Sequence, residues 1–337
     1  MTRTVLIDAD VLGRRRTGDE TYVTNLLRAL PVPATEAGLR LAAVTRRPDL
    51  VPDGVEPVEL TAGLQELRMA WKVPSVLRKL RPALAHFQHA LPLRPRCPTV
   101  LTLHDLSFER GWKAMPLKDT IVFRARVRRS ARTTQRVIAV SERTKHDAVE
   151  LYGLSPERVV VIPHGVDPAF SPGGDGGSYL LFVGAVQARK DPLAAAEAAQ
   201  EVGLPLVVVG PENDARLARE LRRRGADLRG YVEKEDLAEL YRGAACLLLP
   251  SRYEGFGLPV LEAMASGTPV VAAAEPALQE VADGAAVFAD RNGLADAVRR
   301  ALQERERLSA AGLERARMFD WAEAARRHVE VYLEALA

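Results

Sequence analysis

One stretch of the chain, residues 245–262, combines a strand, a glycine-bearing loop and the start of a helix, and it constrains the fold more than any other segment. The apolar run at 245–249 is typical of a strand buried in a parallel sheet. Pro259 is typical of the first turn of a helix, and the helix is expected to end before Gly267. Such strand, loop and helix units are the building blocks of α/β folds.

Two carboxylates lie in this stretch. Glu254 is in the loop, and Glu262 follows about one turn into the helix, so both are expected to face the opening of the loop. A carboxylate accepts hydrogen bonds from paired hydroxyls, such as those of a sugar or a ribose. The alternative interpretation is that two acids on a loop and a helix are ordinary solvated charges.

The residues between these acids suit a phosphate. Gly255 and Gly257 have no Cβ that would block a ligand. The N–H groups of Phe256, Gly257 and Leu258 lie at the start of the helix, where backbone donors attract anions. The loop therefore predicts a site for a nucleotide sugar, with hydroxyls on the carboxylates and phosphates on the amides.

The whole pattern, Glu-Gly-Phe-Gly-Leu-Pro-x-Leu-Glu at 254–262, resembles the signature of retaining glycosyltransferases of the GT-B fold. These belong to the large family 4, or group 1, which includes α-mannosyltransferases and sucrose synthases. The resemblance implies an α/β architecture of two Rossmann-like domains, whose parallel sheets face each other across a cleft. It also implies a last helix that crosses back to the first domain.

The 337 residues exceed one ordinary core and predict two domains. We expect a first domain at 1–168, a Pro- and Gly-rich linker at 169–178, a second domain at 179–320 and a terminal helix at 321–337 that packs back on the first domain. The resemblance assigns acceptor binding to the first domain and nucleotide-sugar binding to the second.

The first half of the chain is basic. Residues 1–170 hold 27 Lys and Arg against 18 Asp and Glu, whereas the rest holds 20 against 26. This asymmetry suits an anionic partner, such as a phosphorylated substrate, a lipid surface or nucleic acid. The basic, apolar segments at 64–80 and 118–136 predict attachment to an anionic membrane surface. Solvated outer faces of Rossmann helices are the alternative.

Other features bear on the compartment and on metal binding. The sequence shows no apolar run near the ~18 residues of a membrane span. The strand-like segment 5–7 follows the first residues directly, without the pattern of a signal peptide. We therefore expect a cytoplasmic protein that binds the inner face of the membrane at most peripherally. Cys97 and Cys246 fall in different expected domains, which argues against a disulfide or a metal site. The Asp-x-Asp at 8–10 resembles a GT-A metal motif, but no nucleotide-binding half precedes it, and no metal is expected.

His104 follows the strand expected at 99–103, and ligands of open α/β sheets lie beyond the carboxyl ends of strands. A lone histidine is otherwise typically structural. Thr-Leu-His-Asp-Leu-Ser here resembles the family segment whose histidine points at the donor sugar and phosphate, so His104 is predicted to be catalytic. His86 and His89 have no such support, and His164 lies in a turn motif, so these three are predicted to be structural.

Arg189 and Lys190 follow the strand expected at 179–183 and suit a diphosphate, Arg189 as a fork and Lys190 as a point charge. From composition alone they are surface charges. The phrase Phe-Val-Gly-x-x-x-x-Arg-Lys-Asp resembles the diphosphate-binding loop of the family. Some relatives place an arginine directly after this glycine, where the chain has Ala185, so it stays open whether Arg189 replaces that contact.

Two further residues are assigned through the resemblance. Gly18 precedes a helix and matches the loop that contacts donor phosphate or acceptor, although one such glycine is usually just a turn. Val232 matches the loop whose backbone reads the nucleotide base. The resemblance also gives Glu262 the ribose hydroxyls, and it gives Glu254, with the amides of residues 255–257, the sugar.

Together these features predict a retaining glycosyltransferase that moves a hexose from a nucleoside-diphosphate sugar to a sugar, lipid-linked or other hydroxyl acceptor. GDP-mannose is the expected donor and a UDP-sugar the alternative. No cofactor is expected, because cations and amides can stabilise the departing diphosphate. A GT-B sugar-nucleotide epimerase is the rival enzyme. A membrane- or nucleic-acid-binding protein that uses the basic half is the rival outside enzymes, without a nucleic-acid motif in its support.

Overall fold

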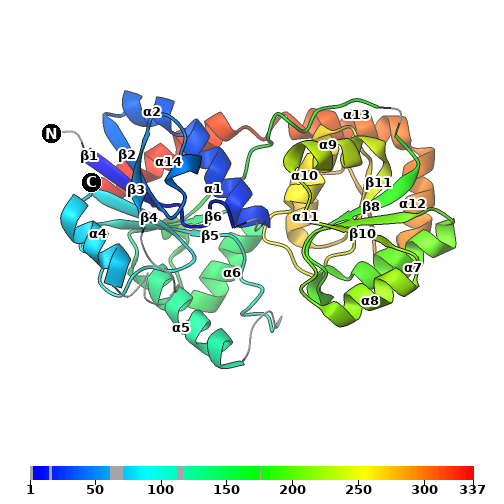
Figure 1. Cartoon of the computed structure of the whole chain (residues 1–337), viewed down its shortest axis with the longest axis horizontal. Helices are drawn as coiled ribbons and strands as arrows, with labels where there is room; N and C mark the ends of the chain where they lie inside the picture. Colours follow the sequence, from blue (N-terminus) through cyan, green and yellow to red (C-terminus); the bar gives the residue numbers. More distant parts are fainter. Residues whose placement is uncertain (1–2, 15–16, 61–70, 112–116, 175) are drawn as a thin grey trace. The chain divides into compact units, whose positions relative to one another are not determined.

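The computed structural model describes residues 3–14, 17–60, 71–111, 117–174 and 176–337. The chain forms two compact units, each built around its own parallel sheet (Figure 1). Unit 1 comprises Met1–Gly165 with Trp321–Ala337, and unit 2 comprises Val166–Asp320. The α/β fold with two Rossmann-like sheets is therefore confirmed.

The described part of unit 1 contains a seven-stranded sheet in the order β3-β2-β1-β4-β5-β6-β7, with parallel pairing throughout. Its inner strands are largely buried on both faces, as helix-covered parallel strands are, whereas the edge strand β3 is largely exposed. They are β1 (Arg3–Asp8), β2 (Leu39–Thr45), β3 (Val55–Glu59), β4 (Leu84–Gln88), β5 (Thr99–Leu103), β6 (Arg136–Ala139) and β7 (Val159–Val161).

The helices of unit 1 cover the sheet in two layers (Figure 1). Val5 and Ile7 of β1 point to one layer and Leu6 to the other, because side chains alternate along a strand. The first layer contains α1 (Thr17–Ala29), α2 (Pro31–Glu36) and α14 (Trp321–Leu336), and the second contains α4 (Val73–Leu80), α5 (Leu117–Thr133) and α6 (Glu142–Tyr152). Short 3-10 turns lie at η1 (Pro48–Leu50) and η3 (Pro156–Arg158).

A buried polar network joins α14 to the rest of unit 1. His86 Nδ1 lies 2.8 Å from Tyr332 Oη, and Tyr22 Oη lies 2.8 Å from His328 Nε2. Thr102 Oγ1 connects the two pairs, at 2.7 Å from His86 Nε2 and 3.0 Å from Tyr22 Oη. Buried polar atoms are stable only when they are hydrogen-bonded, so this network fixes where the last helix packs.

The described part of unit 2 contains a six-stranded parallel sheet in the order β10-β9-β8-β11-β12-β13. Its strands are β8 (Tyr179–Val183), β9 (Leu206–Val209), β10 (Asp227–Gly230), β11 (Ala244–Leu249), β12 (Val270–Ala273) and β13 (Val287–Ala289). Its helices are α7 (Pro192–Val202), α8 (Ala215–Arg223), α9 (Lys234–Gly243), α10 (Leu258–Ala265), α11 (Pro276–Ala282), α12 (Leu294–Gln303) and α13 (Arg305–Ala316), with 3-10 turns η4 (Ala188–Lys190) and η5 (Arg291–Gly293).

Each sheet changes its direction of winding at one pair of neighbouring strands. In unit 2 the chain proceeds outward from β8 to β9 and β10 on one side, and from β11 to β12 and β13 on the other. In unit 1 the corresponding pair is β1 and β4. Open α/β sheets bind ligands beyond the carboxyl ends of strands at such points. Each unit therefore has one preferred place for a ligand.

Some elements differ from the expected ones. Strands β4 and β10 were not predicted from the sequence. The helix expected at 64–80 begins at Val73, with Pro74 in its first turn, and residues 61–70 lie outside the described part. The expected linker 169–178 lies within unit 2, where Phe170 packs on Tyr241. Among the described helices, none has both the length and the apolar character needed to cross a membrane.

Candidate active site

The loop between β11 and α10 lies at the point in unit 2 where the winding direction changes. Its last residue, Gly257, has φ +110°, a conformation that residues with a Cβ rarely adopt. A Cβ at this position would also lie 2.6 Å from Leu278 Cδ2. Glycine is therefore required here by both the backbone and the packing, which allows the chain to enter α10 at this angle.

A second loop, which contains η4 after β8, is tied to this first loop. The N–H of Arg252 donates a hydrogen bond to the Arg189 carbonyl at 2.9 Å. The Arg252 guanidinium also donates to Asp191 Oδ2, at 2.7 and 3.0 Å. Asp191 and Arg252 thus fix the two loops to each other. Neither residue was predicted from the sequence, because a pattern within one segment does not show that these loops lie together.

Three of the predicted site residues meet between these loops. Lys190 Nζ lies 2.5 Å from Glu254 Oε1, and Arg189 Nη1 lies 3.6 Å from Glu254 Oε2. Arg189 also donates to the Tyr253 carbonyl at 2.5 Å. Burial raises the pKa of Glu254, which is only 6% exposed, but the charges of Lys190 and Arg189 outweigh burial and lower it overall. The three groups together carry one net positive charge.

Glu262 on α10 has a different environment. The Tyr241 hydroxyl donates a hydrogen bond to Glu262 Oε2 at 2.8 Å. Burial raises the pKa of Glu262, which is 8% exposed, to about 7; the Tyr241 hydrogen bond opposes this rise and the charge of Asp167 adds to it. Asp167 in turn accepts a hydrogen bond from Lys234 Nζ at 2.8 Å. Nothing in the sequence alone had linked Tyr241 or Asp167 to Glu262.

His104 lies in unit 1, directly after β5. Its Nε2 is 3.0 Å from Gln88 Oε1, and its ring packs edge-on against Tyr22 with 4.7 Å between centroids. Burial lowers the pKa of His104 to about 4, in spite of the opposing charge of Asp19. The imidazole is therefore neutral at pH 7. It can donate one hydrogen bond and accept one, but it brings no positive charge to a phosphate.

The remaining predicted residues lie in separate places. Gly18 is exposed in the first turn of α1 in unit 1. Val232 is half-buried in unit 2, in the loop between β10 and α9. The structure thus joins Arg189, Lys190 and Glu254 by direct contacts, whereas Gly18 and Val232 each lie near the start of another helix.

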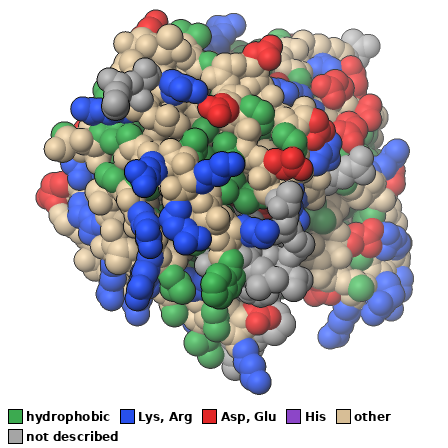
Figure 2. Space-filling view, turned by 60° about the vertical axis from the view of Figure 1, so that its left-hand side comes forward, with side chains coloured by type: hydrophobic (Ala, Val, Ile, Leu, Met, Phe, Trp, Pro, Cys, Tyr) green, Lys and Arg blue, Asp and Glu red, His purple; other side chains and the backbone are tan. Residues whose placement is uncertain are grey.

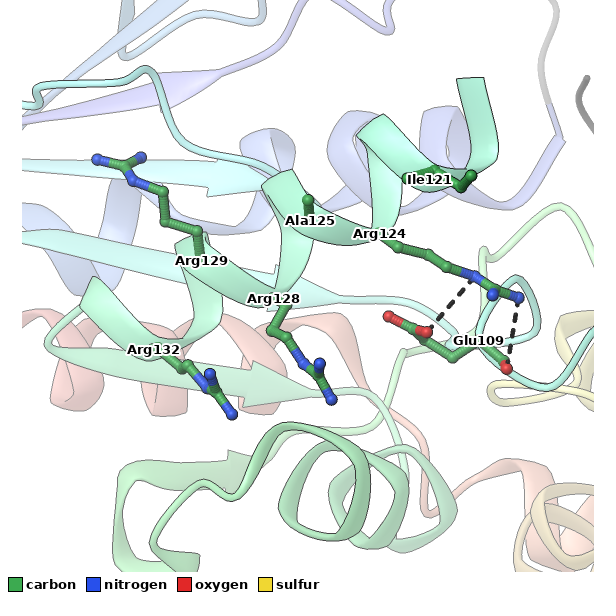
Figure 3. A pocket seen from close by; sticks show the side chains of 7 residues that line it. All are labelled: Glu109, Ile121, Arg124, Ala125, Arg128, Arg129 and Arg132. Carbon is green, nitrogen blue, oxygen red and sulfur yellow. Dashed lines mark hydrogen bonds and ion pairs between the residues drawn. The ribbon is translucent and has the colours of Figure 1, made fainter. Parts of the chain in front are cut away.

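A basic pocket of about 550 Å³ lies against α5 in unit 1 (Figure 3). Arg128 donates to the Leu151 carbonyl at 2.6 Å and Arg132 to the Tyr152 carbonyl at 2.9 Å, so carbonyls orient these guanidinium groups without neutralising them. Among the described residues, its lining consists of Glu109, Ile121, Arg124, Ala125, Arg128, Arg129 and Arg132. The lining is therefore strongly cationic and suits an anion.

The raised pKa of Glu262 predicts how stability depends on pH. The folded protein holds this proton up to about pH 7, but the unfolded chain releases it near the usual 4.5. The contribution of Glu262 to the free energy of unfolding is therefore fully present below about pH 4.5. It falls by roughly 3 kcal/mol as the pH rises to about 7. Glu262→Gln should remove this loss, so its thermal midpoint relative to wild type should rise between about pH 5 and pH 8.

Glu254→Gln is the matched control for this comparison. The pKa of Glu254 is lowered, so its contribution is present above about 4.5 and is lost only as the pH falls below that value. The midpoint difference between wild type and Glu254→Gln should therefore stay constant over the same interval. A difference for Glu262→Gln that does not change with pH would contradict the environment described here.

The chain matches two family models in succession. Residues 16–170 match the model described as Glycosyltransferase Family 4, and residues 177–304 match the model described as Glycosyl transferases group 1. The second match contains Arg189, Lys190, Glu254 and Glu262. The two matches divide the chain much as the two units do.

Individual proteins agree with these models. A D-inositol 3-phosphate glycosyltransferase from Xylanimonas cellulosilytica is 31% identical over 70% of this chain and 72% of its own length. The O-antigen chain mannosyltransferase B from Escherichia coli is 28% identical, over 89% and 84%. The chain spans 59% and 51% of the lengths of two other D-inositol 3-phosphate glycosyltransferases, from Frankia alni and a Nocardioides species. Anabaena HepE, solved in complex with UDP-glucose, has the same fold, with a TM-score of 0.72, 15% identity and coverage of 98% and 99%.

The two family models together match most of the chain, and one relative is 31% identical over more than two thirds of both chains. The chain is a GT-B glycosyltransferase and belongs to glycosyltransferase family 4, the group 1 glycosyl transferases.

Proposed function

We propose that unit 2 holds a nucleoside-diphosphate sugar and that the hexose is transferred, with retention of configuration, to a hydroxyl acceptor held by unit 1. The observation that carries this proposal is the contact of Arg189 and Lys190 with Glu254, beside the start of α10. Two cations on one carboxylate leave a net positive charge next to helix amides. This combination suits a diphosphate.

The chemistry requires stabilisation of charge on the departing nucleoside diphosphate. Preorganised cations and backbone donors supply it without reorganisation during the reaction. Arg189 and Lys190 take this role in the proposal, together with the amides of Phe256, Gly257 and Leu258. Glu254 orients the two cations and accepts hydrogen bonds from the sugar. The resemblance of residues 254–262 to the signature of retaining glycosyltransferases supports the proposed retention, with attack from the face that the diphosphate leaves.

Glu262 binds the ribose in this proposal. Its carboxylate, once ionised, can accept hydrogen bonds from both hydroxyls of a ribose diol. The Tyr241 hydroxyl occupies Oε2 and fixes the orientation of the group. The backbone near Val232 contacts the base. In unit 1, the neutral His104 donates to or accepts from a sugar hydroxyl, and Gly18 allows close approach to the backbone.

GDP-mannose is the proposed donor. The similarity to a protein named as a mannosyltransferase supports mannose, at 28% identity. A UDP-sugar remains the alternative, because HepE of the same fold was solved with UDP-glucose. A sugar-nucleotide epimerase is the second candidate reaction. It would consume the donor with no acceptor present, so incubation with donor alone separates the two.

The acceptor is proposed to be lipid-linked and to be met at an anionic membrane surface. Six basic residues on α5 are opposed by one acid, Asp119. Ile121 and Val122 on the same helix are 57% and 55% exposed. Basic side chains gather on the same side of the molecule as exposed apolar ones (Figure 2). Apolar side chains among cations suit insertion between anionic lipid headgroups.

The roles of the two acids predict different effects of their substitution. Glu262→Gln should weaken the binding of GDP or UDP roughly 10- to 150-fold, because hydrogen bonds to a charged group contribute about 1.5–3 kcal/mol. Glu254→Gln should reduce turnover at least about 100-fold and change nucleotide affinity far less. Calorimetric titration with each nucleotide and an assay of nucleotide release measure both, and the tighter nucleotide identifies the donor base.

Glu235→Gln serves as the control, because Glu235 is an exposed acid in the first turn of α9 in the same unit. It should leave both quantities unchanged. Equal nucleotide affinity of wild type and Glu262→Gln would overturn the ribose assignment. If wild type binds neither nucleotide, the proposed donor class is wrong.

Membrane attachment is tested with vesicles of phosphatidylcholine that contain phosphatidylglycerol. Wild type should sediment with these vesicles at low salt and be released by high salt, because the attraction is screened. The double substitution Ile121→Ser and Val122→Ser should weaken sedimentation several-fold. Val32→Ser, which changes a valine 69% exposed on α2, should not. Failure of wild type to sediment, or equal weakening by Val32→Ser, would contradict attachment through α5.

A further inference from the structure

We propose that unit 1 contains a binding site for a divalent transition-metal ion, formed by Asp19, His89 and His104. One potential ligand atom from each residue lies within 4.8 Å of the other two. Asp19 is in the first turn of α1, His89 follows β4 and His104 follows β5. All three therefore lie at the carboxyl ends of strands, next to the point where the winding of this sheet reverses.

One of the three distances between potential ligand atoms is already close to that of a metal site, and the other two are at most 4.8 Å. Asp19 Oδ2 and His89 Nε2 are 3.2 Å apart. Around tetrahedral zinc, with ligand distances near 2.0–2.2 Å, neighbouring ligand atoms lie about 3.3 Å apart. One edge of such a tetrahedron is thus already formed. Two histidines and one carboxylate also leave a coordination position open and are a ligand set suited to zinc, cobalt or iron(II).

The polar atoms around this group are incompletely satisfied. Gln88 Oε1 lies 3.0 Å from His104 Nε2 and can fix that ring, as outer partners of metal ligands do. Within the described residues, however, Gln88 Nε2 and His89 Nδ1 are buried without a hydrogen-bond partner. Buried polar atoms without partners in a native fold point to a bound water or ion. A water molecule bound to the ion would supply an acceptor for Gln88 Nε2, whereas His89 Nδ1 lies on the other side of its ring from Nε2 and is not satisfied by the ion.

A second group of similar composition in the same chain shows what a purely structural cluster looks like. His146, Asp147 and Glu150 also satisfy the distance criterion. There the acids have cationic partners: Asp147 accepts from Arg110 at 2.6 Å and from Arg143 at 3.1 Å, and Arg110 also pairs with Glu150. Arginines thus neutralise that cluster, and a metal would have to displace them. Within the described part of the chain, the ion pair of Asp19 is with His89, at 3.2 Å, and not with an arginine or lysine.

The site has a regulatory consequence, which rests on the proposed function. His104 is the residue of unit 1 proposed to contact the sugar. A metal ion on His104 occupies that contact, so the ion should inhibit transfer, and removal of the ion by a chelator should restore it. Metal binding itself does not depend on this role and is measured without donor or acceptor.

The experiment titrates the full chain with Zn²⁺ by calorimetry and with Co²⁺ by visible absorption. Wild type should bind one ion, and the Co²⁺ form should show the intense bands of a tetrahedral site. Asp19→Asn and His89→Asn should each weaken binding at least about tenfold. Asparagine is chosen at 89 because it tolerates the φ of +60° found there. His146→Gln is the control and should bind as wild type does.

Several results would overturn the proposal. They are the absence of tetrahedral Co²⁺ bands in wild type, unchanged affinity in both Asp19→Asn and His89→Asn, or loss of binding in His146→Gln alone. Zn²⁺ that binds at the site without slowing transfer would disprove the regulatory consequence and leave the site intact. Loss of transfer activity in every condition, with Zn²⁺ binding retained, would instead count against the proposed function.

Discussion

The contact between Lys190 and Glu254 is the interaction on which the site in unit 2 depends. It joins a loop after β8 to a loop after β11, at the one place where the sheet changes its direction of winding. The buried carboxylate alone would be costly, and the two cations, which are only partly exposed, would repel each other without it. Each is stable here because of the other. In the proposed function, a diphosphate supplies the negative charge that balances the remaining positive one.

The same short stretch of chain holds two carboxylates with opposite properties. Cations hold the pKa of Glu254 below its usual value, whereas burial raises that of Glu262 to about 7. One acid is therefore always charged near neutral pH, and the other changes its charge within that range. Such a difference between neighbouring acids is typical of functional sites, where environment rather than residue type assigns the role. In the proposed function, this difference separates the acid assigned to the sugar from the acid assigned to the ribose.

Local patterns in the sequence were sufficient for much of this account. The strand, loop and helix at 245–262, the division into two units and the Arg189-Lys190 pair all follow from residues that are close in the chain. Strand β4 was missed because His86 interrupts its apolar run. This histidine is buried with both ring nitrogens hydrogen-bonded, one to Thr102 and the other to Tyr332 of the last helix. A pattern within one segment cannot reveal such a partner.

The parts of the sites that the sequence did not reveal are contacts between distant segments. Asp191 and Arg252 fix the two loops of unit 2, and Tyr241 orients Glu262. Likewise, His89 was predicted to be purely structural because it has no motif around it. The fold places it 3.2 Å from Asp19. These residue types are ordinary in isolation, and only the three-dimensional arrangement gives them a chemical role.

Hydrogen exchange of the backbone amides, measured with and without the nucleoside diphosphate, tests the central claim most directly. A diphosphate held between the two loops of unit 2 should slow exchange at residues 254–262 and 188–191. Protection confined to α5, or no protection in either loop at a nucleotide concentration that saturates binding, would contradict the account.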